Sequence, residues 1–178
     1  MKRFRMHFLF ILIFLFCYKN ASAKEHCHVD EEVALSIFKK NDAKFISNNC
    51  EIALDNQYVE SFLIIQNKKL FLNRVKGRVG NGEGAELVAV SLYRKKSKLP
   101  VLITLYSETY CCYPQPSGKL YKVDLYNIVK NGNNISLKPI TDILGDNSSG
   151  LEGVSDDYMH FKFKDIASIK KWLDKNYK

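Results

Sequence analysis

The apolar run Val101-Leu-Ile-Thr-Leu-Tyr-Ser107 leads into the loop Thr109-Tyr-Cys-Cys-Tyr-Pro-Gln-Pro-Ser-Gly118, and a second apolar run, Leu120–Val129, follows. The loop holds two adjacent cysteines, two tyrosines and two prolines. Proline lacks the N–H that a strand interior uses, and glycine and serine are typical of turns. The three segments therefore predict two neighbouring strands joined by a turn.

Short runs of β-branched and aromatic residues lie on both sides of this pair, separated by brief turns. These further predicted strands are Tyr58–Ile65, Leu70–Val79, Leu87–Tyr93, Ile135–Ile140 and Tyr158–Lys164. Short strands at this spacing indicate an antiparallel meander, here a sheet of about six or seven strands. The polar segment Gly145–Asp157 predicts a surface loop. The segment Ala43–Leu54 fits a helix and a strand equally well, so no prediction is made for it.

A helix is predicted at each end of the domain. Near the amino terminus, Asp30-Glu31-Glu32 precedes apolar residues and then Lys39-Lys40-Asn41, a charge order that the helix macrodipole favours. Near the carboxyl terminus, Asp165 is a predicted N-cap. It is followed by an apolar stripe at helical spacing, made of Ile166, Ile169, Trp172 and Leu173. Together with the sheet, the two helices predict an α+β fold.

The first 23 residues have the features of a secretory signal peptide. A basic stretch at residues 2–5, an apolar core at residues 8–16 and the small-residue cleavage signal Ala21-Ser22-Ala23 follow one another. The apolar run is shorter than the roughly 20 residues of a spanning helix. We therefore predict that residues 1–23 are removed and that no stable membrane anchor remains. Residues 24–178 are predicted to form one exported domain, periplasmic or secreted.

The charge balance argues against nucleic acid as a partner. The full chain has 27 Lys and Arg against 19 Asp and Glu. The predicted signal peptide holds four of the basic residues and none of the acids, which leaves 23 against 19 and a net charge of about +4. Such a small excess, spread along an exported chain, is not typical of nucleic-acid binding.

Four cysteines remain after cleavage, Cys27, Cys50, Cys111 and Cys112, and an oxidising compartment makes disulfides the default. In the favoured arrangement, Cys27 bonds to Cys50 across the predicted first helix, and Cys111 bonds to Cys112. In the other, Cys111 and Cys112 point to opposite faces of an extended chain and bond separately to Cys27 and Cys50.

The leading functional hypothesis is a non-catalytic binding protein, such as an inhibitor, an immunity-type protein or a ligand-binding module. Prolines restrict the backbone and tyrosines offer flat faces with a polar tip, features that recognition surfaces use. The predicted binding residues are Tyr106, Tyr110, Tyr113, Pro114, Pro116 and Tyr121. The expected partner is a protein or a small polar ligand, and no cofactor is expected. An equally weighted alternative is that the tyrosines fill the core and the prolines only end a strand.

A second hypothesis is a metal-handling protein. Cleavage after residue 23 starts the chain at Lys24-Glu25-His26, and a histidine in third position offers, with the free amine and two amides, a square-planar nitrogen set. That set suits Cu(II) or Ni(II). The predicted ligands are His26 and His28.

A third hypothesis is a hydrolase of unknown chemistry built on Asp156, Asp157 and His160. These side chains are typical of acid–base catalysis. No spacing in the chain matches a known catalytic or cofactor motif, so no catalytic residues are predicted.

Overall fold

The computed structural model describes residues 25–52, 57–77, 84–111 and 116–178, which form two antiparallel sheets. In sheet A the strands lie in chain order: β1 (His26–Leu35), β2 (Ala43–Glu51), β3 (Gln57–Ile65) and β4 (Lys68–Lys76). Sheet B has the order β10-β9-β7-β6-β5, with β8 also paired to β7. Its strands are β5 (Glu86–Tyr93), β6 (Val101–Tyr110), β7 (Ser117–Asn131), β8 (Asn134–Pro139), β9 (Ser149–Val154) and β10 (Tyr158–Met159). A 3₁₀ segment, η1 (Thr141–Ser148), and the helix α2 (Ile166–Asn176) complete the described chain.

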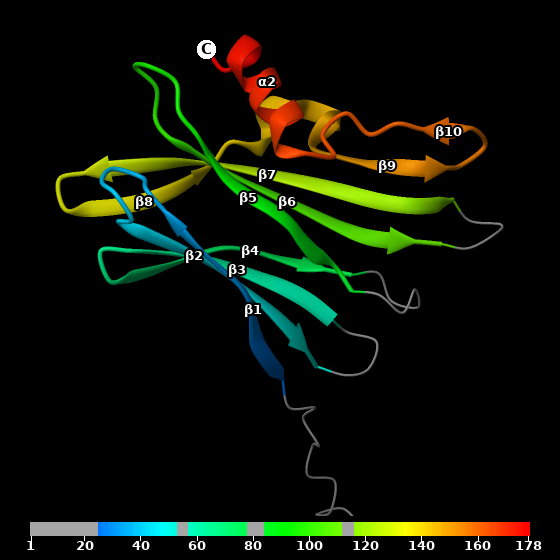
Figure 1. Cartoon of the computed structure of the whole chain (residues 1–178), viewed down its shortest axis with the longest axis horizontal. Helices are drawn as coiled ribbons and strands as arrows, with labels where there is room; N and C mark the ends of the chain where they lie inside the picture. The colour runs from blue at the N-terminus through cyan, green and yellow to red at the C-terminus, as the bar shows by residue number, and fades with distance from the viewer. Residues whose placement is uncertain (1–24, 53–56, 78–83, 112–115) are drawn as a thin grey trace, which may run out of the picture.

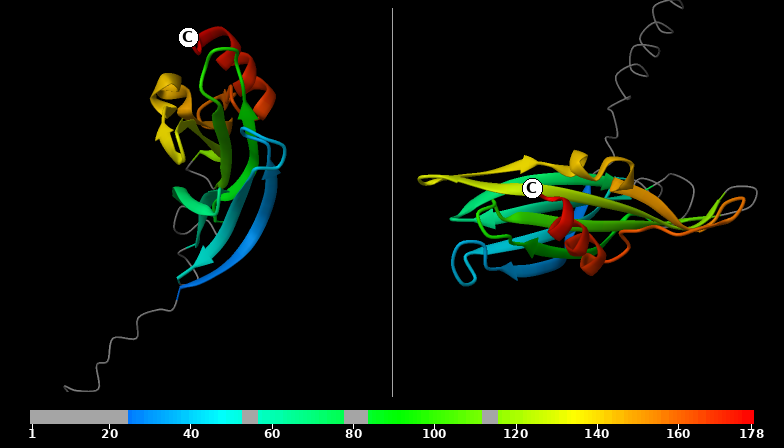
Figure 2. Two further views of the ribbon diagram at one scale, coloured as in Figure 1. Left: turned by 90° about the vertical axis from the view of Figure 1, so that its left-hand side faces the viewer. Right: turned by 90° about the horizontal axis from the view of Figure 1, so that it is seen from above.

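The elements stack in three layers. Figure 1 shows sheet A on one side of sheet B and α2 on the other, and Figure 2 shows the stack from two further directions. One apolar core lies between the sheets and includes Phe45, Leu63 and Leu102. A second core lies between sheet B and α2 and includes Ile103 and Leu173. Sheet B therefore buries both faces, and the fold is mainly β.

The strand β6 explains the apolar run on which the fold prediction was based. All residues from Val101 to Ser107 are buried. Leu102 belongs to the core between the sheets, whereas Ile103 and Leu105 belong to the core beneath α2. A strand covered on both faces has no polar alternation, because neither face meets water.

The strand β7 is 15 residues long and pairs with three others. Along one edge it pairs with β6, and along the other edge residues 117–122 pair with β9 and residues 126–131 with β8. Between β8 and β9, Ile140 donates its N–H to the Leu125 carbonyl (2.9 Å), and Leu125 donates its own N–H to Thr141 Oγ1 (3.0 Å). The edge of β7 therefore remains hydrogen-bonded in the gap between the segment that pairs with β9 and the segment that pairs with β8.

The predicted amino-terminal helix is wrong, because residues 30–41 form the second half of β1 and the turn into β2. The Asp42 side chain makes most of the side-chain hydrogen bonds to the backbone of this turn. Asp42 accepts hydrogen bonds from three backbone N–H groups, those of Ile37 (2.6 Å), Phe38 (2.8 Å) and Lys39 (2.9 Å). A carboxylate that collects three amides stabilises the turn, and the hairpin then pairs β1 with β2, which a helix cannot do.

Replacing Asp42 with Ala is expected to lower the free energy of unfolding by about 2 kcal/mol, since bonds to a charged acceptor contribute more than neutral ones. Burial raises the pKa of the Asp42 carboxyl, and the three backbone N–H donors lower it by more, so that it lies below its ordinary value. This contribution is therefore present above the unfolded-state pKa of about 3.9 and is lost as pH falls through the lower folded-state value. Urea denaturation at pH 7 and at steps below pH 4 measures both effects.

Asp42→Asn is expected to lack this part of the acid destabilisation, whereas the exposed-site variant Asp156→Asn keeps it. An acid transition that is identical in all three proteins would contradict the role assigned to Asp42.

The single predicted sheet of six or seven strands is also wrong, since in the described ranges ten strands form two sheets. The segment Ala43–Leu54, for which no prediction was made, contains β2. The predicted loop Gly145–Asp157 contains part of η1 and β9. Of the predicted strand Tyr158–Lys164, only Tyr158–Met159 is a strand. The chain leaves the sheet there because the Phe161 N–H bonds to Glu152 Oε2 (2.8 Å) and the Phe161 ring enters the core beneath α2.

The closing helix is confirmed. The helix α2 begins at Ile166, and its N-cap Asp165 accepts a hydrogen bond from the Ser168 N–H at 2.7 Å. Ile169 and Leu173 are buried, as the predicted apolar stripe requires. The local sequence pattern was enough to predict this helix, because the N-cap residue and the apolar stripe indicate the same helical segment.

Candidate functional site

A cavity of about 520 Å³ opens at the end of the molecule where β1 begins and β6 ends. Its size is within the range of small-molecule sites. The residues that line it come from both sheets and are His26, His28, Asn49, Cys50, Glu51, Gln57, Tyr58, Gly84, Ala85, Glu86 and Thr109. Most of these side chains are polar, so the cavity suits a polar group.

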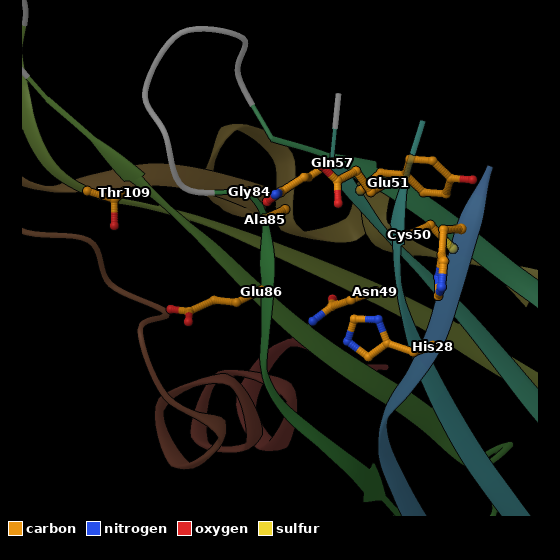
Figure 3. Close-up of a pocket in the computed structure, with 11 residues that line it drawn as sticks. His28, Asn49, Cys50, Glu51, Gln57, Gly84, Ala85, Glu86 and Thr109 are labelled. Atoms are coloured by element: carbon orange, nitrogen blue, oxygen red, sulfur yellow. The ribbon is translucent and has the colours of Figure 1, made fainter. Parts of the chain in front are cut away.

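Sheet A supplies one wall of the cavity. Successive side chains of a strand point to opposite faces, which places His26 and His28 on the same face of β1. In the pairing of β1 with β2, His26 lies opposite Glu51 and His28 lies opposite Asn49. Figure 3 shows His28 and Asn49 directed toward β5. The register of β1 with β2 therefore places two imidazoles beside an amide and a carboxylate on this wall.

Cys27 and Cys50 form a disulfide, as predicted, and they lie directly opposite one another in β1 and β2. The bond joins two strands and does not cross a helix. It lies between His26 and His28 along β1, so it holds the histidine-bearing end of this edge strand to its neighbour. A structural disulfide is compatible with an exported protein.

Glu86 of β5 supplies a carboxylate on the opposite side. Its Oε1 accepts hydrogen bonds from Lys119 Nζ (2.8 Å) and Ser107 Oγ (2.7 Å). The bond from Lys119, and then that from Ser107, lower the pKa of Glu86. The carboxylate therefore stays ionised at neutral and mildly acidic pH. Its other oxygen, Oε2, has no hydrogen-bond partner among the described residues.

Gln57 closes the cavity against the start of β5. A Cβ atom placed on Gly84 would lie 2.9 Å from both Cβ and Oε1 of Gln57, so that only glycine allows this approach. Figure 3 shows Gln57 extended toward Gly84. Ala85, next along the chain, is 8% exposed and also lines a second cavity of about 220 Å³. Ala85 therefore borders both cavities.

The predicted binding loop meets the cavity at its first residue, Thr109. Tyr110, Cys111 and Pro116 are half-buried, whereas Tyr113, Pro114 and Cys112 lie outside the described residues. Cys111 is disulfide-bonded, and its partner also lies outside the described ranges. The thiol of Cys111 is therefore not a free nucleophile.

Tyr106 and Tyr121, also predicted to bind, lie within the fold. Tyr106 is 0% exposed, and its hydroxyl is hydrogen-bonded with Ser61 Oγ (2.7 Å) and Asn73 Oδ1 (3.0 Å). Tyr121 is half-buried and stacks on Phe161 with the ring centroids 5.8 Å apart. These contacts match the alternative in which tyrosines fill the core. Both residues line the smaller cavity and neither lines the larger one.

The predicted metal ligands His26 and His28 share the cavity wall. Lys24, whose amine a copper site would use, lies outside the described residues. Within the described ranges, no group of three or more His, Cys, Asp or Glu side chains is placed to hold a metal ion.

The predicted hydrolase residues lie elsewhere. Asp156, Asp157 and His160 are exposed and follow β9, with the His160 side chain 76% exposed. His160 Nδ1 lies 3.5 Å from Glu152 Oε1. None of the three predicted residues lines either cavity. An exposed hairpin does not provide the enclosed, preorganised setting that hydrolysis needs.

Several lining residues, among them Asn49, Glu51, Gln57 and Glu86, were not singled out from the sequence. None belongs to a recognisable motif. Assigning Ala43–Glu51 as a strand would have placed Asn49 and Glu51 on one face. Which face meets a cavity depends on the second sheet.

Comparison of the chain with family models, with curated proteins and with solved structures finds no match. No helix in the described ranges is long and apolar enough to cross a membrane. The cavity and its side chains are therefore the basis for a functional proposal.

Proposed function

We propose that this chain is a small exported binding protein without catalytic activity. It holds a small polar ligand, or a polar side chain of a protein partner, in the cavity of about 520 Å³. One observation carries the proposal. Thr109, the first residue of the loop singled out in the sequence, lines the same cavity as His26 and His28, which were singled out independently.

The chemistry of the lining supports binding rather than catalysis. Among the described lining residues the one sulfur, that of Cys50, is bonded to Cys27. The hydroxyl nearest to Glu86, that of Ser107, is 2% exposed and donates to this carboxylate. Neither group has the activated, accessible arrangement of a nucleophile. The remaining imidazole, amide, carboxylate and hydroxyl groups are suited to hydrogen bonding.

Export is part of the proposal. The predicted signal peptide at residues 1–23 and the disulfide between Cys27 and Cys50 support it. On this proposal the partner also contacts the residues predicted to bind, Tyr110, Tyr113, Pro114 and Pro116. Tyr106 and Tyr121 then act indirectly, by supporting the strands β6 and β7.

A bulky substitution inside the cavity tests the proposal. Asn49→Trp places a ring on the cavity face of β2, whereas Asn48→Trp places the same ring on the opposite face of the strand. Four probes are used: spermidine, citrate, N-acetylglucosamine and tetra-alanine. At least one is expected to shift the amide NMR signals of Asn49, Gln57 and Glu86 in the native chain. Asn49→Trp is expected to weaken that binding at least tenfold, and Asn48→Trp is not.

Thermal melts of both variants establish that each is folded. The proposal fails if no probe shifts these signals, or if a probe binds the folded Asn49→Trp variant as well as the native chain.

A further inference from the structure

We infer that the group held in this cavity is a cation, an ammonium or a guanidinium. The inference rests on the proposed binding function and adds the charge of the ligand to it. It follows from the charged groups that face the cavity and from the acceptor atoms they leave open.

The lining of the cavity contains two carboxylates, Glu51 and Glu86, and no lysine or arginine among the described residues. Lysines and arginines outnumber the acids in the chain as a whole, 27 to 19. The cavity therefore departs from the average charge of the protein. A ligand that enters loses part of its hydration, and a charge opposite to that of the wall offsets this cost.

The Glu51 carboxylate has no counter-ion among the described residues. Glu51 is half-buried at the end of β2, and its side chain has no hydrogen bond or ion pair with any described residue. Glu32 of the same sheet is paired by contrast, since its Oε1 lies 2.6 Å from Lys44 Nζ. Across the register, His26 of β1 lies opposite Glu51. Both oxygens of Glu51 are thus open to a donor.

Glu86 already binds one ammonium group, that of Lys119, at 2.8 Å. That contact and the bond from Ser107 both use Oε1, which leaves Oε2 open. Lys119 also offsets part of the charge of Glu86, so its removal should strengthen the attraction for a cation. The same removal should weaken the binding of an anion.

Isothermal titration at pH 8 and low salt tests the charge of the ligand. Spermidine represents free polyamines, and Nα-acetyl-lysine amide and Nα-acetyl-arginine amide represent side chains of a protein partner. Nα-acetyl-norleucine amide is the neutral control of similar shape. The cationic probes are expected to bind and the neutral one is not. A preference for the amino-acid amides over spermidine identifies a protein side chain as the source, and the reverse preference identifies a free polyamine.

Glu51→Gln keeps the shape of the side chain and removes its charge. It is expected to weaken cation binding at least tenfold, about 1.4 kcal/mol. Glu32→Gln, on the surface of the same sheet, is expected to leave binding unchanged. Lys119→Met is expected to strengthen binding, a change that loss of folding cannot produce.

The inference is overturned if citrate or the neutral amide binds as well as the cations do, or if Glu51→Gln and Lys119→Met leave cation affinity unchanged. In that case, loss of citrate or amide binding in Asn49→Trp would still support the proposed function. If no probe binds at all, the proposed function falls as well.

Discussion

A variant with Cys27→Ala and Cys50→Ala is expected to lose about 3 kcal/mol of its free energy of unfolding. The bond closes a loop between residues 23 positions apart, and a loop of this length restricts the unfolded chain by about that amount. Denaturation of the double variant and of the native chain in guanidinium chloride measures the difference. Reduction of the native protein is a poorer test, because it also opens the bond of Cys111.

The same variant is expected to loosen the cavity wall. The strand β1 is at the edge of sheet A, and residues 26–32 are exposed, so few packing contacts hold this end. Amide hydrogen exchange should become faster in residues 26–29 of β1, while β6 stays protected. Unchanged exchange in β1 would show that strand pairing alone holds the histidines in place.

Truncation of Tyr106 to Ala is expected to cost about 3–5 kcal/mol, the usual range for a fully buried aromatic ring. The ring is 0% exposed, and its hydroxyl is hydrogen-bonded with Ser61 Oγ and Asn73 Oδ1. Tyr106→Phe keeps the ring and removes both hydrogen bonds, so it should cost about 1–3 kcal/mol. Urea denaturation of the two variants separates the ring from the hydroxyl.

Tyr106 also predicts a dependence on alkaline pH. Burial raises the pKa of its hydroxyl to about 12, because the ionised form is poorly solvated between the sheets. The folded-state value exceeds the unfolded-state value of about 10, so stability is full below pH 10 and falls as pH rises from 10 toward 12. Tyr106→Phe should show a smaller alkaline loss. Tyr93 and Tyr126, whose pKa values are also raised by burial, account for a remaining part.

The Tyr106→Phe variant also distinguishes a structural role of Tyr106 from a ligand-binding role. If Tyr106 contacts a ligand directly, Tyr106→Phe should weaken probe binding more than it weakens folding. If it only fills the core, probe affinity at a temperature where the variant is folded should stay within twofold of the native value. Equilibrium titration on the folded variant decides between them.

Several elements were predictable because a local pattern and its burial agree. The run Val101–Ser107 is apolar at nearly every position, and β6 is covered on both faces. Asp165 has an N-cap role that depends on the amide of Ser168, three residues away. The pairing of Cys27 with Cys50 was favoured, and it is found although the helix expected between them is absent.

Other elements were mispredicted because the contacts that decide their structure differ from those that the local sequence pattern suggests. Residues 30–41 have the charge order of a helix, but Asp42 collects the amides of the turn and β1 gains β2 as a partner. Phe161 and Phe163 alternate as in a strand, yet both enter the core beneath α2. Alternation shows that a side chain is buried and does not show which neighbour buries it.

The sequence by itself determined most strand positions and the closing helix with its cap. These depend on hydrogen bonds and side-chain periods within a few residues. The tertiary structure decided that the strands divide into two sheets and that α2 covers sheet B. It also decided that His26, Glu51, Glu86 and Thr109 border one cavity. The physical reason is that strand register and the stacking of sheets join residues far apart in the chain, and no local pattern records which of those residues will meet.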